Sequence, residues 1–405
     1  MLNCLTYNEL VNYIFFINII LNLFEKAEGA YLIKLLFWIL ITVINPTNAN
    51  AFFGVDKNDY SSVEKAFKTE TPPLFQYKGN KFCKGGILYM IPYSKINGAK
   101  KSHTSGKLKS WFFALSFGHA ISSFLEGEFR SDHAYKKEDF INKYIPYLVK
   151  AAENKYFTVN KWVKGGSSVA YAQTMILINL SVLMDFMDNK NLWKNGQRET
   201  IVKWGNILYQ RSHYSHVKNG GKKQSNRWPD TVSKAAAAYM LWGYVNKDLK
   251  IFKDGYRDLM QEYEKIPADG KYHQHFKGPY AGVIQDSWDL FIENKTLGDL
   301  VIASYVGELV GMETFTKPNN KGGNIKKAID YLGKISSNSN ELKGQDERHL
   351  SNMRADGNSW VTVYRKMDKS DSNPLVSLHL KSSNEKGYAF SQILNFSRCI
   401  DNELK

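Results

Sequence analysis

Two polar stretches of the sequence hold side chains that can bind and transform an acidic molecule. The first runs from His213 to Asp230, and the second runs from Pro267 to Tyr280. Four of the nine histidines lie in them, interleaved with aromatic rings, amides and basic residues. Aromatic rings stack on sugar faces, Arg, Lys and Asn bind carboxylates, and imidazole exchanges protons near neutral pH. The combination indicates a site for an acidic sugar.

One reaction that such groups can perform is β-elimination on a uronate. Donors must neutralise the sugar carboxylate, a base must remove the C5 proton, and an acid must protonate the departing O4. Asn226 suits the carboxylate, and His275 or His273 suits the base. Tyr280 or Tyr272 suits the acid, and either can make both transfers when the geometry is syn.

Other residues of the same stretches are candidates for substrate binding. Arg227 or Lys277 can add a cation at the carboxylate, and Trp228, flanked by polar residues, can stack on a sugar ring. Lys222 and Lys223 form a basic run that attracts polyanions. Each of these side chains also has a simpler interpretation, as a solvated loop residue or as part of the core.

Composition and charge support a polyanionic partner. The chain has 405 residues, 43% of them hydrophobic, and 54 Lys and Arg against 39 Asp and Glu give a net charge of +15. The apolar fraction excludes wholesale disorder, and three cysteines exclude a disulfide scaffold or a multi-zinc protein. Nucleic acid, anionic membrane and acidic polysaccharide remain as partners of so basic a chain.

The N-terminus has the features of a secretory signal. An apolar run at 35–44 follows Lys34, and the small residues Ala49 and Ala51 predict cleavage near Phe52. Export makes nucleic acid an unlikely partner, so we expect a periplasmic or secreted monomer that binds acidic polysaccharide and keeps no stable membrane partner after cleavage.

The 31 residues that precede the signal-like segment allow two other interpretations of the N-terminus. Translation starts near Leu32, or residues 1–51 form a membrane hairpin or anchor, although each apolar stretch is shorter than the roughly 20 residues of a spanning helix. In an exported chain, Cys83 and Cys399 either form a disulfide or stay as two thiols.

The elements that must position these side chains are helices. Between 105 and 340 apolar residues recur at spacings of three and four, and glycine-bearing polar breaks separate the helical runs. Broadly apolar, aromatic-rich faces favour concentric helix layers, so we predict a mainly α fold, an (α/α) toroid or incomplete barrel of helical hairpins. We expect 1–51 to be a targeting segment and 52–104 to be a loop-rich N-terminal segment.

The C-terminal part, 341–405, carries a different pattern. The strand-forming residues at 360–364 and 375–380 flank a turn-like segment at 368–374. This pattern predicts a β-hairpin, and hence a small β-containing extension packed against the toroid.

The two polar stretches resemble those of the hyaluronate and chondroitin AC type of polysaccharide lyase. In that family an Asn precedes a Trp-rich, acidic stretch at the start of a helix, and the first stretch resembles this pattern with Asn226, Trp228 and Asp230. Further along, the family has an Asp-Gly pair, then a histidine, a tyrosine five residues later and a glycine. The second stretch matches this spacing with Asp269, Gly270, His275, Tyr280 and Gly282. The resemblance implies an (α/α) toroid, a lyase activity, a carboxylate-neutralising Asn226 and a catalytic His275. Alginate-lyase-type toroids are a second, weaker resemblance.

The resemblance is incomplete at one important position. The family's catalytic tyrosine falls nine residues after the histidine, where this chain has Ile284. Tyr280 or Tyr272 takes its place, or the chain binds acidic glycan without cleaving it.

A glycoside hydrolase on the same toroid is another alternative. Inverting hydrolysis needs two carboxyl groups roughly 6.5–9.5 Å apart, and the carboxylates near the two stretches are Asp230, Asp269, Asp286 and Asp289. The pair His273 and His275 lacks a clear third ligand, and neither a P-loop nor a nucleophile elbow is present, so we expect no metal and no cofactor.

Overall fold

The structure is a computed structural model. The residues that it describes are 59–69, 71–75, 113–114, 117–118, 120–121, 138, 140–158, 169–220, 229–272, 287–337, 360–370 and 372–377. The chain divides into two compact units, Met1–Tyr60 and Ser61–Lys405, and all the elements described below belong to the second unit.

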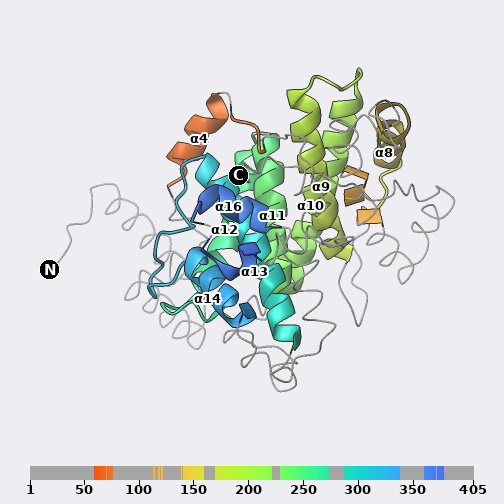
Figure 1. The fold of residues 1–405 in the computed structure, drawn as a ribbon. Helices are drawn as coiled ribbons and strands as arrows, with labels where there is room; N and C mark the ends of the chain where they lie inside the picture. The colour runs from red at the N-terminus through yellow and green to blue at the C-terminus, as the bar shows by residue number, and fades with distance from the viewer. Residues whose placement is uncertain are drawn as a thin grey trace, which may run out of the picture. The chain divides into compact units, whose positions relative to one another are not determined.

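The described part of the chain is helical, as the apolar spacing predicts (Figure 1). Within it there is no strand, and Pro267 and Gly322 form an isolated antiparallel bridge. The helices in chain order are α4 (Ser61–Lys68), the π-helix η2 (Phe140–Tyr144), α8 (Ile145–Glu153), α9 (Val169–Asn189), α10 (Gln197–Gly220), α11 (Pro229–Val245), α12 (Leu249–Tyr263), α13 (Ser287–Leu309), α14 (Ile325–Ser337) and α16 (Val361–Met367).

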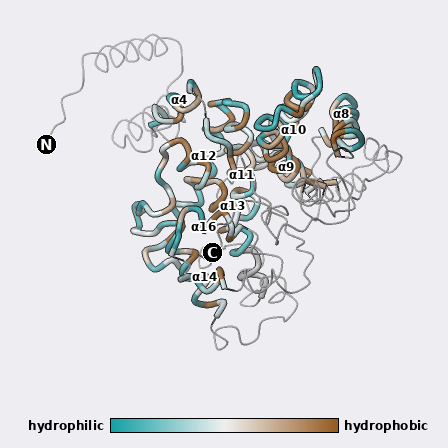
Figure 2. Tube along the Cα trace, turned by 45° about the horizontal axis from the view of Figure 1, so that its top comes forward, coloured by the Kyte–Doolittle hydropathy of each residue, from teal (hydrophilic) through white to brown (hydrophobic). Residues whose placement is uncertain are grey.

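Helix α9 is buried along almost its whole length. All of its residues from Val169 to Met187 are buried, and hydrophobic colour runs along it in Figure 2, whereas α8 carries both colours. Among the described residues, α9 is long and apolar enough to cross a membrane, but 94% of its most apolar window is buried inside the structure. A helix that is hydrophobic all round and covered on all sides is a core helix.

Two glycines allow α11 and α12 to pack closely. A Cβ atom at Gly255 of α12 would lie 2.6 Å from the backbone nitrogen of Met240, and one at Gly243 of α11 would lie 2.5 Å from that of Phe252. Real Cβ contacts are not this short, so only glycine fits at either position. The hairpin of α11 and α12 therefore depends on the absence of two side chains.

Helices α9, α11 and α13 run parallel to one another. Near their N-terminal ends, the Nζ atoms of Lys234 in α11 and Lys295 in α13 lie 5.8 and 5.4 Å from the ring centroid of Tyr171 in α9. Near their C-terminal ends, residues of the same three helices all bind the backbone of segment 71–75. We call these two ends of the layer the N-terminal pole and the C-terminal pole.

The C-terminal pole holds segment 71–75 against the three helices. Asp185 Oδ1 of α9 accepts a hydrogen bond from the Leu74 N–H at 2.8 Å. The hydroxyl groups of Tyr244 in α11 and Tyr305 in α13 donate to the carbonyl oxygens of Pro72 and Leu74, at 2.6 and 2.7 Å. These buried or partly buried hydrogen bonds fix the N-terminal segment to the helical layer.

The predicted β-hairpin is wrong where the structure describes it. Residues 361–367 form α16, and residues 374–377 are also helical. Trp360 is fully buried, and its Nε1 donates to Asn294 Oδ1 of α13 at 3.0 Å, while the Tyr364 ring contacts Phe315 edge-on at 5.8 Å. Burial against α13 decides the local structure here, because β-propensity reflects packing more than backbone preference.

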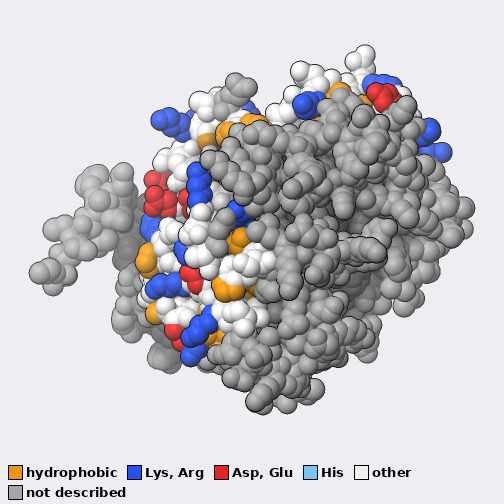
Figure 3. Space-filling model, in the orientation of Figure 1, with side chains coloured by type: hydrophobic (Ala, Val, Ile, Leu, Met, Phe, Trp, Pro, Cys, Tyr) orange, Lys and Arg blue, Asp and Glu red, His pale blue; other side chains and the backbone are white. Residues whose placement is uncertain are grey.

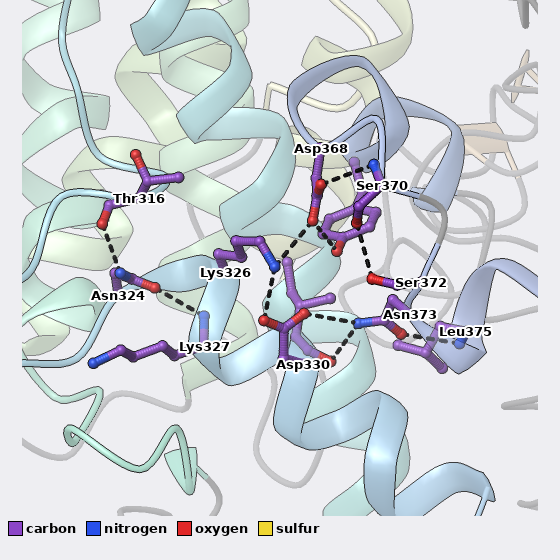
Figure 4. Close-up of polar contacts among 12 residues, drawn as sticks. Thr316, Asn324, Lys326, Lys327, Asp330, Asp368, Ser370, Ser372, Asn373 and Leu375 are labelled. Atoms are coloured by element: carbon purple, nitrogen blue, oxygen red, sulfur yellow. Dashed lines mark hydrogen bonds and ion pairs between the residues drawn. The ribbon is translucent and has the colours of Figure 1, made fainter.

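Polar contacts join α16 to α14 (Figure 4). Lys326 Nζ lies 2.8 Å from Asp330 Oδ2 and 3.0 Å from Asp368 Oδ2. The Nδ2 of Asn373 donates to the carbonyl of Ile329 at 3.1 Å. The described part of the predicted extension is therefore a helical layer joined to α13 and α14.

Candidate active site

The two polar stretches found in the sequence lead into helices at the N-terminal pole. Segment 221–228 leads into α11, and segment 273–286 follows Tyr272 and leads into α13. Since α11 and α13 are parallel neighbours, both loops enter the layer from the same end. The side chains at these attachment points form the candidate site that the structure describes.

Most of the predicted site residues lie outside the described residues. They are Asn226, Arg227, Trp228, Lys222, Lys223, His273, His275, Lys277 and Tyr280, together with Ile284. Cys83 and Cys399 also lie outside them. The roles proposed for these residues stay predictions, and among the candidates for the elimination reaction the structure describes the surroundings of Tyr272.

Tyr272 is buried in a carboxylate-rich environment. Its side chain is 1% exposed, and its hydroxyl donates to Glu262 Oε2 of α12 at 2.6 Å. Burial raises its pKa well above the usual value, and the nearby negative charges of Glu262, Glu293 and Asp230 raise it further. Carboxylates from α11, α12 and α13 therefore surround this hydroxyl, directly before segment 273–286.

A buried ion pair lies beside this group. Lys234 Nζ of α11 is 2.6 Å from Asp299 Oδ1 of α13, and neither side chain is exposed to solvent. Burial raises the pKa of Asp299 to about 6, because the loss of hydration outweighs the attraction to Lys234 and Lys295. Ser233 Oγ also donates to this carboxylate, at 3.4 Å.

A second ion pair links the first turn of α11 to α13. Lys295 Nζ lies 3.4 Å from Asp230 Oδ2, with side chains 11% and 16% exposed. Burial lowers the pKa of Lys295, but Tyr171 and Asp230 outweigh that effect and the net shift is upward. Lys295 therefore stays a cation at this pole. We call the five residues Tyr171, Asp230, Lys234, Lys295 and Asp299 the polar cluster.

His213 occupies a different place from the one expected. Helix α10 continues to Gly220, so His213 is helical, although it begins the first polar stretch of the sequence. Its ring stacks on Tyr209 at 5.5 Å, and its Nε2 lies 3.7 Å from Asp254 Oδ2 of α12. Tyr209 also donates a very short hydrogen bond to Asp254, and burial raises the pKa of Tyr209. This group joins α10 to α12.

Of the four carboxylates suggested for hydrolysis, the structure describes the side chains of Asp230 and Asp269. Asp230 is paired with Lys295, and the Asp269 side chain is 55% exposed in a turn. A hydrogen bond from the Lys271 N–H lowers the pKa of Asp269, so it stays ionised and suits no general-acid role. Asp286 and the side chain of Asp289 lie outside the described residues.

The face drawn in Figure 3 shows no concentrated basic patch among its described residues. In the view of Figure 3, Lys and Arg side chains are dispersed among acidic and apolar ones. Among the residues of the described ranges, no three His, Cys, Asp or Glu side chains are grouped to hold a metal ion. The cations that stand out are the two buried lysines of the polar cluster.

Sequence reasoning missed the whole polar cluster except Asp230. Two signals were present: Lys234 directly precedes a run of small and apolar residues, 235–242, and Glu293 to Thr296 form a polar turn inside an apolar helix. Charged residues on a helix that must be buried are costly unless paired. Their partners lie 65 residues away in the chain, as for Lys234 and Asp299, so spacing alone could not reveal them.

Comparison with solved structures shows the same fold in a known enzyme. The crystal structure of alginate lyase A1-III from Sphingomonas species A1 matches with a TM-score of 0.50 and 16% identity, over 81% of this chain and 88% of that chain. Two variants of that enzyme complexed with tetrasaccharide match with TM-scores of 0.49 and 0.47 at 15% identity, over 80% and 79% of this chain and 86% and 85% of theirs.

At this identity the likeness shows the fold alone. No model of a protein family matches the sequence, and neither does any curated protein. The alginate-lyase-type toroid, the weaker of the two resemblances seen in the sequence, has a structural counterpart. The chain adopts the helical toroid fold of a polysaccharide lyase.

Proposed function

We propose that the protein is an exported lyase that cleaves an acidic, uronate-containing polysaccharide by β-elimination. The observation that carries the proposal is the attachment of segments 221–228 and 273–286 at the same pole of the toroid. The shared fold with alginate lyase A1-III and the net charge of +15 support the same conclusion.

The reaction divides among groups of the two segments. Asn226, with Arg227 or Lys277, neutralises the uronate carboxylate and so acidifies the C5 proton. His275 or His273 takes that proton, the C5–H electrons form the C4–C5 double bond, and the C4–O4 bond breaks. A tyrosine then gives a proton to O4, and the products are a new reducing end and an unsaturated uronate.

Tyr280 is the better candidate for the proton donor than Tyr272. The Tyr272 hydroxyl is buried, donates to Glu262 and has a pKa raised well above its ordinary value. A tyrosine in this position anchors the start of segment 273–286 and does not reach a substrate. Tyr280 compensates for Ile284 at the position where the hyaluronate and chondroitin AC type has its tyrosine.

The fold favours alginate as the first substrate to test, with glycosaminoglycans second. Trp228 stacks on a sugar ring, and Lys222 and Lys223 attract the polyanion. We propose that the mature protein begins near Phe52, acts as a periplasmic or secreted monomer and needs no cofactor. Hydrolysis has weaker support, because Asp230 is paired with Lys295 and Asp269 is exposed.

Incubation of the purified protein with alginate, hyaluronan, chondroitin sulfates and heparin tests the proposal. We expect new chain ends that absorb in the near ultraviolet, because elimination creates a double bond conjugated to the carboxylate. Saturated products would indicate hydrolysis. Binding of the polysaccharide without any product would instead identify a non-catalytic glycan-binding protein.

A further inference from the structure

One turn of α13 is polar and almost completely enclosed by the protein. Glu293, Asn294 and Thr296 have no exposed surface, and Lys295 is 9% exposed. The Nδ2 of Asn294 and the Oγ1 of Thr296 have no hydrogen-bond partner among the described residues. Enclosing polar and charged groups costs stability, and an apolar turn of the same shape is often as stable or more stable.

This turn belongs to α13, which follows segment 273–286, and it is paired with the start of α11, which follows segment 221–228. Lys295 is paired with Asp230 at 3.4 Å, in the first turn of α11 and two residues after segment 221–228. Segment 273–286 leads directly into α13, and Tyr272, which precedes that segment, donates to Glu262 of α12 at 2.6 Å. The two attachment points are therefore joined through one pair of helices.

Tyr171 completes the arrangement from the third helix. Its ring lies 5.4 Å from Lys295 Nζ and 5.8 Å from Lys234 Nζ, within the range of a cation–π interaction. Lys234 is held in turn by Asp299 at 2.6 Å. Residues of α9, α11 and α13 therefore hold the two lysines together. A shift of α11 along α13 would break both ion pairs, Lys295 with Asp230 and Lys234 with Asp299.

We propose that Lys295 and Asp230 are positioning residues for the acid–base site. Their ion pair fixes the first turn of α11 against the polar turn of α13, so that both loops leave the toroid with a set spacing. The inference rests on the proposed function, since it names residues that support that reaction without touching the substrate. Rates are sensitive to such spacing, because a displacement of about 1 Å can cost about 100-fold.

The test removes the pair without leaving an unpaired charge. In the full-length double variant Lys295→Met with Asp230→Asn, we expect the unfolding midpoint to stay within about 5 °C of the wild type. We expect kcat on the best polysaccharide of the panel to fall about 100-fold, and KM to change less than about threefold. A merely structural pair would change the midpoint and leave kcat unaltered, and that result would overturn the proposal.

The matched control removes the ion pair that joins α14 to α16. Lys326 Nζ and Asp368 Oδ2 are 3.0 Å apart, and neither residue belongs to the polar cluster. The double variant Lys326→Met with Asp368→Asn should keep the kcat of the wild type. If the first variant does not fold, the double variant Lys295→Gln with Asp230→Asn gives the same comparison, since both side chains are neutral and stay polar.

Hydrogen exchange separates this inference from the proposed function. In the Lys295 and Asp230 variant we expect the backbone amides of 231–235 and 270–272 to exchange at least about tenfold faster, and in the control variant at the wild-type rate. This result is expected even if the wild type yields no unsaturated product, an outcome that would reject only the lyase proposal. Unchanged exchange at both attachment points would overturn the positioning role.

Discussion

Asp299 and Lys234 show how the folded chain handles charge at the level of single residues. Both side chains are fully enclosed, and they face each other at 2.6 Å. Enclosure disfavours the ionised carboxyl strongly enough that its pKa rises to about 6 despite two nearby lysines. A group that changes protonation near pH 6 inside the core links the stability of the N-terminal pole to pH.

The sign of that pH effect is opposite to the usual one for a carboxyl group. The unfolded chain releases this proton near pH 3.9, whereas the folded chain keeps it to about pH 6, so between these values the folded state binds more protons. We expect the free energy of unfolding of the wild type, relative to Asp299→Asn, to fall by about 2 kcal/mol from pH 4 to pH 7. Urea titrations at each pH measure it, and a rise over this window would contradict the shift.

The histidines provide a second prediction at the residue scale. His275→Ala removes the proposed base and should lower kcat by a factor of about 10²–10⁴. His213→Ala is the matched control, because His213 packs against Tyr209 and Asp254 in the described structure. We expect this control to keep its kcat. Steady-state kinetics on the preferred polysaccharide give kcat for both variants. An equal loss of kcat in the two variants would argue against His275 as the base.

At the scale of elements, the helices followed from the sequence and their packing did not. The apolar spacing between 105 and 340 predicted helices, and α12 and α14 lie in that range, because amphipathic helices carry their own signal. The pattern at 360–364 predicted a strand and the structure shows a helix, because Trp360 and Tyr364 are buried against α13 and α14. Local residue preferences do not record which surface will cover a segment.

The α11–α12 hairpin offers a prediction at this scale. Gly255→Ala places a Cβ 2.6 Å from the Met240 backbone nitrogen, so the two helices must separate. We expect a loss of about 1–3 kcal/mol in the free energy of unfolding. In the control Gly307→Ala, the new Cβ would lie 3.3 Å from its nearest atom, the carbonyl oxygen of Met312. The better helix propensity of alanine offsets this contact, so we expect little change in the free energy of unfolding. Denaturant unfolding ranks the two variants, and equal stability would contradict the close packing.

At the scale of the whole molecule, the sequence identified the class of fold, and the structure added the direction of the helices. The toroid was predicted from broadly apolar helix faces, and the match to alginate lyase A1-III supports it. The common pole of α9, α11 and α13 depends on contacts such as Tyr171 with Lys295, more than a hundred residues apart in the chain. Such contacts bring the two attachment points together, and no local pattern encodes them.

The central claim is that side chains of segments 221–228 and 273–286 face the same sugar. An experimental structure of the protein with a bound uronate oligosaccharide tests it most directly. The account predicts that the Asn226 amide contacts the carboxylate of one uronate while the His275 imidazole lies beside C5 of the same ring. Asn226 and His275 on opposite sides of the toroid, or an oligosaccharide bound away from the N-terminal pole, would contradict it.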